Sequence, residues 1–154
     1  FAGPGVAKSS RCSKPAELLD LYPTLSDLAG LPQASGMEGH SLLPQLKDAN
    51  SPRKWPAITT HNHDNHGIRS EHWRYIRYAD GSEELYDMRK DPNEWDNLAD
   101  APQFSSIKKE HAVFLPERNL KPVKGSASRI LVYEEGFPVW EGQRIHSGDL
   151  IPGK

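Results

Sequence analysis

An alternating aromatic stretch followed by a tight-turn signal constrains this chain more than any other feature. Residues 73–78 (WRYIRY) place aromatic and branched side chains at a period close to two. The dipeptide Asp80-Gly81 follows, and it is one of the strongest short-range signals for a hairpin turn. Residues 84–88 (ELYDM) then provide a partner strand. The sequence therefore predicts an antiparallel β-hairpin at this position.

The segments on either side of the hairpin extend this prediction to a small α+β layer. Residues 56–60 and 67–70 are candidate strands that precede the hairpin, so an antiparallel meander is expected. Residues 103–115 are expected to form a helix that covers one face of the sheet. Four of its residues recur at helical spacing: Ile107, His111, Phe114 and Leu115.

The first 50 residues predict a different local structure. Residues 1–6 have the composition of a buried strand end followed by a Gly/Pro turn. A helix is expected next, with Asp20 as its N-cap and Gly30 as its stop. Pro23 is tolerated because it falls in the first turn, where backbone N–H groups lack helical partners. A second short helix is expected at residues 41–46.

The last third of the chain carries weaker signals. Residues 117–128 are rich in Pro, Lys and Gly and suit a surface linker, and residues 129–133 predict one more strand. The remainder is expected to be irregular, with Phe137 and Trp140 packed rather than exposed. We therefore divide the chain into three predicted parts: residues 1–50, residues 51–116 and residues 117–154.

Charge and hydropathy argue against two classes of partner. Nineteen Lys and Arg residues stand against 21 Asp and Glu residues, so no net positive field exists to attract nucleic acid. The mean hydropathy is -0.72 and no apolar run reaches the roughly 20 residues of a membrane span. The sequence begins at Phe1 without a secretion-signal pattern, so we expect it to start within a longer protein.

Short motifs in the first 100 residues resemble the C-terminal end of sulfatases of the alkaline-phosphatase-like superfamily, above all the iduronate-2-sulfatase-like and choline-sulfatase-like branches. The motifs occur in the order and spacing of that family. They lie at residues 19–25 (LDLYPTL), 28–30 (LAG), 36–44 (GMEGHSLLP), 66–70 (HGIRS), 73–76 (WRYI), 84–87 (ELYD), 91–94 (DPNE) and 97–98 (NL).

The resemblance implies an α/β parent fold, to which residues 1–46 contribute a last strand and helix, followed by a small C-terminal antiparallel sheet. It implies a sulfuric ester hydrolase that acts on a sulfated carbohydrate or a small sulfate ester. It also implies a periplasmic or secreted location. The partner of this chain would then be the N-terminal catalytic part of the same polypeptide.

Sulfatases use a formylglycine, made from the cysteine of a C-x-P-x-R motif, together with a calcium ion. Cys12 is followed by residues 13–16 (SKPA), so its proline comes one place late and no arginine follows. We therefore expect no catalytic residue and no metal ligand in this chain. Calcium and formylglycine are implied only for the parent enzyme. The chain alone is expected to be inactive, completing the fold and part of the substrate pocket.

The richest polar cluster is residues 61–66 (HNHDNH), with three histidines between two predicted strands. Histidines at this spacing can bind zinc, but the aspartate stands one place too early for the H-x-H-x-D-H motif of metallo-β-lactamase-like hydrolases. A loop that contacts the sugar or sulfate and a solvated structural loop are the two other interpretations. The candidate substrate-binding residues are His61, His63, Asn65, His66 and Arg69.

Three arginines could form a cationic strip for a sulfated polymer. Alternation places Arg69 and Arg77 at one parity and Arg74 at the other, and acidic residues lie nearby. Cross-strand ion pairs are therefore the favoured interpretation. Two rival functions remain open from sequence: a non-catalytic glycan-binding or structural module, and a small metallohydrolase built on the histidine cluster.

Overall fold

The computed structural model describes residues 1–121, 123, 131–140 and 143–149. The chain divides into two compact units, Phe1–Asn119 and Leu120–Lys154. We describe each unit by itself. None of the helices in the described residues is long and apolar enough to cross a membrane.

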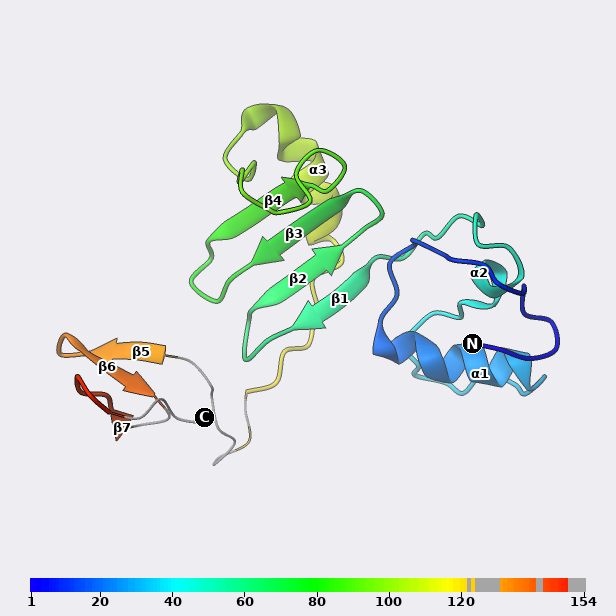
Figure 1. Cartoon of the computed structure of the whole chain (residues 1–154), viewed down its shortest axis with the longest axis horizontal. Helices are drawn as coiled ribbons and strands as arrows, with labels where there is room; N and C mark the ends of the chain where they lie inside the picture. The colour runs from blue at the N-terminus through cyan, green and yellow to red at the C-terminus, as the bar shows by residue number, and fades with distance from the viewer. Residues whose placement is uncertain (122, 124–130, 141–142, 150–154) are drawn as a thin grey trace. The chain divides into compact units, whose positions relative to one another are not determined.

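The centre of the first unit is a four-stranded antiparallel sheet in the order β1-β2-β3-β4 (Figure 1). Its strands are β1 (Ala57–Thr60), β2 (His66–Arg69), β3 (Trp73–Arg77) and β4 (Glu83–Asp87). Gly81, at φ 86°, turns the chain between β3 and β4, where Tyr78 N donates to Ser82 O. The predicted meander and its hairpin are confirmed.

The register of the sheet places four apolar residues opposite one another. Ile58 faces Ile68, Ile68 faces Tyr75, and Tyr75 faces Leu85. Ile68, Tyr75 and Leu85 have no exposed surface and form the core with Ala99. This row exists because strand alternation sends every second side chain to the same face.

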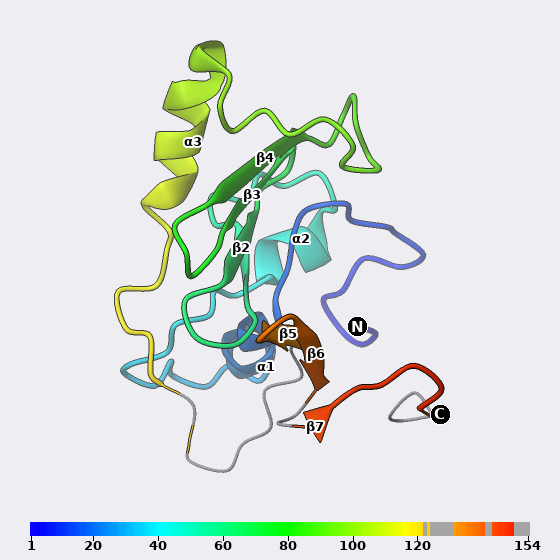
Figure 2. The same ribbon diagram turned by 90° about the vertical axis from the view of Figure 1, so that its left-hand side faces the viewer.

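Helix α3 (Ser105–Ala112) covers this face, as Figure 2 shows with the sheet seen nearly edge-on. A 3-10 turn, η2 (Pro102–Phe104), precedes α3. His111 ties the helix to the sheet, since its Nε2 lies 2.8 Å from the hydroxyl of Ser70 and its Nδ1 lies 2.7 Å from Ile107 O. The predicted covering helix is confirmed, although it ends three residues earlier than expected and continues as turns through Leu115.

Asn97 completes the outer edge of β4. Its Oδ1 accepts hydrogen bonds from Leu85 N and Ala99 N, and its Nδ2 donates to Glu83 O. Asn97 therefore satisfies backbone groups of β4 that would otherwise be unpaired. An edge strand covered in this way is less open to pairing with another chain.

The first 50 residues form short helices beyond the β1 edge of the sheet (Figure 1). They are η1 (Leu18–Asp20), α1 (Leu21–Leu28) and α2 (Leu43–Lys47). Pro23 lies in the first turn of α1, and Gly30, at φ 66°, follows its end, where Leu31 N donates to Ser26 O. Both features match the prediction.

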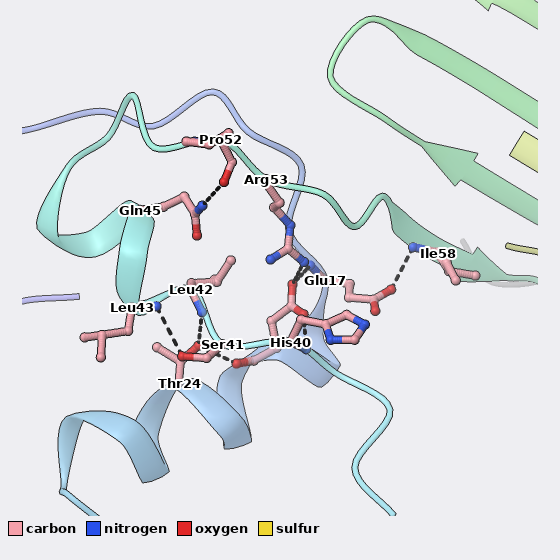
Figure 3. Close-up of polar contacts among 11 residues, drawn as sticks. Glu17, Thr24, His40, Ser41, Leu42, Leu43, Gln45, Pro52, Arg53 and Ile58 are labelled. Carbon is pink, nitrogen blue, oxygen red and sulfur yellow. Dashed lines mark hydrogen bonds and ion pairs between the residues drawn. The ribbon is translucent and has the colours of Figure 1, made fainter. Parts of the chain in front are cut away.

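The Asp20 side chain does not cap α1 as predicted; it is a buried hub instead. Its carboxylate has no exposed surface and accepts hydrogen bonds from Glu17 N at 2.9 Å and His40 N at 2.8 Å. Arg53 Nη2 lies 2.6 Å from Asp20 Oδ2, and the Arg53 side chain is 3% exposed. Figure 3 shows Glu17, His40 and Arg53, which provide these three contacts, close to one another. A buried carboxylate needs such partners, which is why the capping geometry is lost.

Two contacts next to Asp20 connect the helices to β1 and to the segment before it. The Glu17 carboxylate accepts a hydrogen bond from Ile58 N of β1 at 2.7 Å, as Figure 3 shows. The His40 ring stacks on Trp55 with 3.9 Å between ring centroids, and burial lowers the pKa of His40. The helices and the sheet are therefore joined by polar contacts and one aromatic stack.

Gly39 is required by a close backbone approach. A Cβ built at this position would lie 2.0 Å from Leu19 O, which no side chain can relieve. Gly39 thus allows the segment that carries His40 to pass directly over η1 and to donate to Asp20.

The structure differs from prediction at residues 1–6, where it shows turns and no strand. The backbone bonds of this segment and the next residue run from Val6 N to Gly3 O and from Ala7 N to Leu46 O. A strand needs a neighbouring strand to satisfy its backbone groups, and no strand of the described residues lies against this segment.

The second unit contains a three-stranded antiparallel sheet in the order β5-β6-β7. The strands are β5 (Leu131–Glu134), β6 (Phe137–Trp140) and β7 (Gln143–Arg144). The predicted strand near residues 129–133 is found as β5, although residues 129 and 130 lie outside the described residues. The prediction of an irregular end is wrong for β6 and β7, because β6 pairs with both neighbours and buries Val139. Residues 145–149 form no strand or helix, as predicted, and residues 150–154 lie outside the described residues. Phe137 is 45% exposed, so it is less packed than expected.

Replacing Arg53 by Met should destabilise the chain by about 3–5 kcal/mol, because Asp20 would remain as a buried charge without its cation. Arg74→Met is the matched control, since its pair with Glu94 is partly exposed and should contribute only about 0–1 kcal/mol. Urea unfolding followed by tryptophan fluorescence measures both changes. An equal loss in the two variants would contradict the role given to the Asp20 hub.

Candidate functional site

The histidine cluster forms the loop that joins β1 to β2. His61 N donates to Asn65 O at 2.9 Å and closes the loop. Asn62 and Asp64 have φ values of 57° and 62°, a left-handed conformation that Asn and Asp tolerate better than most residues. The backbone conformation of the loop is therefore sufficient to explain Asn and Asp at these two positions, without a ligand.

His66 is the most buried member of the cluster, with only 6% of its surface exposed. Its Nδ1 lies 3.0 Å from Thr60 Oγ1, and its Nε2 lies 3.1 Å from Asn119 Nδ2. The same Asn119 amide donates to Asp64 Oδ1 at 2.5 Å. Because the amide nitrogen is a donor, Nε2 must accept and Nδ1 must carry the proton. His66 is therefore a neutral imidazole whose two nitrogens are both engaged.

The other residues of the loop divide into supporting and accessible ones. Asn65 Nδ2 donates to His63 O at 3.0 Å, and Asn65 Oδ1 accepts from Ala79 N at 3.2 Å. His63 Nδ1 lies 2.6 Å from Asp64 Oδ2, with 32% of the His63 side chain exposed. His61 is exposed. The Asp64 side chain is 49% exposed, so His61, His63 and Asp64 are members of the loop that a ligand can reach.

Arg69 does not join the loop residues. It follows His66 by three positions in β2, so alternation places it on the opposite face of the sheet. Its Nη1 donates to the backbone carbonyls of Ser70 at 2.6 Å and Trp73 at 3.3 Å. Burial, together with the nearby Arg74 guanidinium, lowers the pKa of Arg69. Arg69 therefore supports the β2–β3 turn.

The described residues contain no group of three or more His, Cys, Asp or Glu side chains that could hold a metal ion. Cys12 is an exposed free cysteine outside any C-x-P-x-R motif. The part of the chain that the structure describes thus fits neither the calcium site nor the formylglycine that the sulfatase resemblance implies for the parent enzyme.

A small cavity of about 240 Å³ opens beside His66. It is lined by Asp64, His66, Arg77, Tyr78, Ala79, Gly81, Leu115 and Pro116. Sequence reasoning did not single out Asn119 or Thr60. Thr60 follows from strand register, but nothing local marks Asn119, which lies 53 residues from the histidine it contacts.

The family model described as N-sulphoglucosamine sulphohydrolase, C-terminal, matches residues 4–119. The chain belongs to this sulfatase family. The matched region contains the whole sheet, α3, the histidine loop and Asn119.

Individual relatives agree with the family match. A sulfatase of Formosa agariphila is 39% identical over 119 residues, a match covering 77% of this chain and 24% of that protein. A Delta 4,5-hexuronate-2-O-sulfatase of Bacteroides thetaiotaomicron is 36% identical over 132 residues, covering 76% of this chain and 27% of that protein.

Among solved structures, a 2-O GAG sulfatase is similar with a TM-score of 0.58 and 33% identity, covering 75% of this chain and 27% of that chain. The present chain thus spans about a quarter of the length of the proteins it matches. It corresponds to the C-terminal part of a sulfatase, and the α+β layer described above is the architecture of that part.

Asn119→Ala should release the His66 ring, because Nε2 loses the donor that fixes its tautomer. Two-bond proton–nitrogen NMR correlations distinguish the tautomers. They should show the proton on Nδ1 in the parent chain and a rise in the Nε2–H form in the variant. Asn65→Ala is the control, since Asn65 contacts the loop backbone without touching the ring. An unchanged tautomer in Asn119→Ala would contradict the role of Asn119 in fixing the His66 ring.

Proposed function

We propose that this chain is the C-terminal part of an enzyme that hydrolyses sulfate esters of carbohydrates, with hydrolysis carried out by a part of the polypeptide outside this chain. The match of residues 4–119 to a sulfatase C-terminal family carries the proposal. The described residues supply a folded layer and a polar loop, while the nucleophile motif of sulfatases does not occur in the sequence.

The surface of α1 and η1 supports packing against a catalytic part. Leu18, Leu21, Tyr22 and Leu25 recur at helical spacing and are 85%, 42%, 61% and 56% exposed. A contiguous apolar stripe of this kind is unusual on a free surface and marks an interaction site. We call these four residues the α1 stripe, and its proposed occupant is the catalytic part of the same polypeptide.

Hydrolysis of an anionic sulfate ester requires a strong oxygen nucleophile and preorganised positive charge. In sulfatases these come from formylglycine and calcium with its cationic neighbours. Because the residues described here fit neither group, both are proposed to lie in the catalytic part. The contribution of this chain is then to complete the fold and to line part of the substrate pocket.

The substrate class is proposed from the relatives, whose names are those of a hexuronate-2-O-sulfatase and a 2-O GAG sulfatase. We infer a sulfated carbohydrate that contains acidic sugar units. His61, His63 and Asp64 are the loop residues available to contact it, whereas Asn65 and His66 hold the loop in place. Membership of the iduronate-2-sulfatase-like or choline-sulfatase-like branch, and a periplasmic or secreted location, remain predictions from the sequence motifs.

Turnover of an aryl sulfate and of a sulfated disaccharide tests the proposed function. The 154-residue chain should release no sulfate, and the same chain extended upstream through its reading frame should do so once its cysteine is converted. Hydrolysis by the short chain alone would contradict the proposal. It would favour instead the alternative that the chain is a small metallohydrolase built on the histidine cluster.

The α1 stripe should drive self-association of the isolated chain. Replacing Leu21 and Leu25 by Ser should shift the chain toward monomer, because each exposed leucine contributes about 25 cal/mol per Å² of apolar surface that association buries. Sedimentation velocity measures the change. Val113→Ser, an exposed apolar residue elsewhere, is the control and should leave the association state unchanged.

A further inference from the structure

A polar row crosses the whole sheet beside the apolar core row. Thr60 lies opposite His66, His66 opposite Arg77, and Arg77 opposite Glu83. The row shares a face with the core residues Ile68 and Tyr75, because its members are two residues away along their strands. It therefore lies at the end of the core face, where the chain leaves α3.

The carboxylate that faces Arg77 is already engaged. Glu83 Oε1 accepts from the Tyr75 hydroxyl at 2.5 Å, and Glu83 Oε2 lies 2.7 Å from Lys108 Nζ. Burial and the neighbouring Glu83 raise the pKa of the Tyr75 hydroxyl, and the charge of Arg77 opposes this rise. The charge of Arg77 also favours the ionised form of Glu83, yet Arg77 forms no ion pair with any residue that the structure describes. Arg77 is exposed. The row thus carries one positive charge that its neighbours do not neutralise by direct contact.

The other two arginines of these strands differ from Arg77. Arg74 Nη1 lies 2.6 Å from Glu94 Oε1, and Arg69 donates to backbone carbonyls on the opposite face. The prediction of cross-strand ion pairs is therefore wrong within the described residues: Arg74 pairs with Glu94 of the loop that follows β4, while Arg69 and Arg77 form no ion pair there.

Arg77 lines the cavity beside His66, together with the backbone turn at Ala79 and Gly81. The volume of about 240 Å³ lies below the roughly 300–1,000 Å³ of pockets that hold drug-sized ligands, so it suits one small polar unit. Asp64, at the rim, has one oxygen bound by Asn119 and the other 2.6 Å from His63. Both of these partners reduce the repulsion that Asp64 would exert on an anion.

We propose that this cavity is a subsite for one acidic sugar unit, with Arg77 binding its carboxylate or sulfate group. The guanidinium is planar and matches two oxygens of either anion at once. Asp64 is placed to accept hydrogen bonds from the hydroxyls of the same sugar. The proposal rests on the proposed function for its class of ligand, but every residue that lines the subsite belongs to this chain.

Titration of the nitrogen-15-labelled 154-residue chain tests the subsite directly. The probes are methyl glucuronide, which carries only a carboxylate, N-acetylglucosamine 6-sulfate, which carries only a sulfate, and neutral N-acetylglucosamine. At least one acidic sugar should shift the amide signals of Ala79 and Gly81 saturably, and the neutral sugar should bind at least about tenfold more weakly. The stronger acidic probe identifies the anion that the subsite takes.

Arg77→Gln should weaken binding by at least about tenfold, whereas Arg74→Gln should leave it unchanged, because Arg74 lies on the other face. Arg77→Lys keeps the charge without the paired donors and should give an intermediate loss, and it decides the question if Arg77→Gln does not fold. Absence of saturable shifts with both acidic sugars, or equal weakening by the Arg74 variant, would overturn the subsite. Sulfate release by the extended polypeptide is measured separately, so a failure of the proposed function can be distinguished from a failure of the subsite.

Discussion

The buried Asp20 carboxylate is the interaction on which the first 60 residues depend. A charge without exposed surface is stable only when hydrogen bonds and a cation surround it. Glu17 and His40 supply backbone donors from two separate segments, and Arg53 supplies the cation just before β1. The helices are thereby fixed to the start of the sheet by hydrogen bonds and an ion pair that meet at one carboxylate.

The register of the four strands aligns both the apolar core and the polar residues of the candidate site. Apolar residues of the four strands face each other in one row, and polar residues face each other in the next row on the same face. Helix α3 covers the apolar row, and the chain beyond it delivers Asn119 to the histidine loop. Stability and the candidate ligand contacts therefore share the same strand pairing, so a slip of one residue would remove both.

Local signals account for what could be predicted. The Asp80-Gly81 turn and the alternating strands identified the hairpin, and Pro23 with Gly30 bounded α1, because each depends on neighbouring residues. Asp20 has the sequence position of an N-cap, and only the tertiary approach of Arg53 and His40 made it a buried hub. The contact of Asn119 with His66 and the ion pair of Glu83 with Lys108 likewise join segments that are distant in the sequence. The absent strand at residues 1–6 shows the same limit, since strand formation requires a partner.

Hydrogen–deuterium exchange over residues 18–28 distinguishes a docking helix from a freely exposed one. It would be measured in the 154-residue chain alone and in the upstream-extended polypeptide, with residues 73–88 of the sheet as the internal reference. If the α1 stripe packs on a catalytic part, exchange in residues 18–28 should be much slower in the extended polypeptide while the sheet is unchanged. Equal exchange in the two proteins would contradict the interpretation of this chain as the docked C-terminal part of a sulfatase.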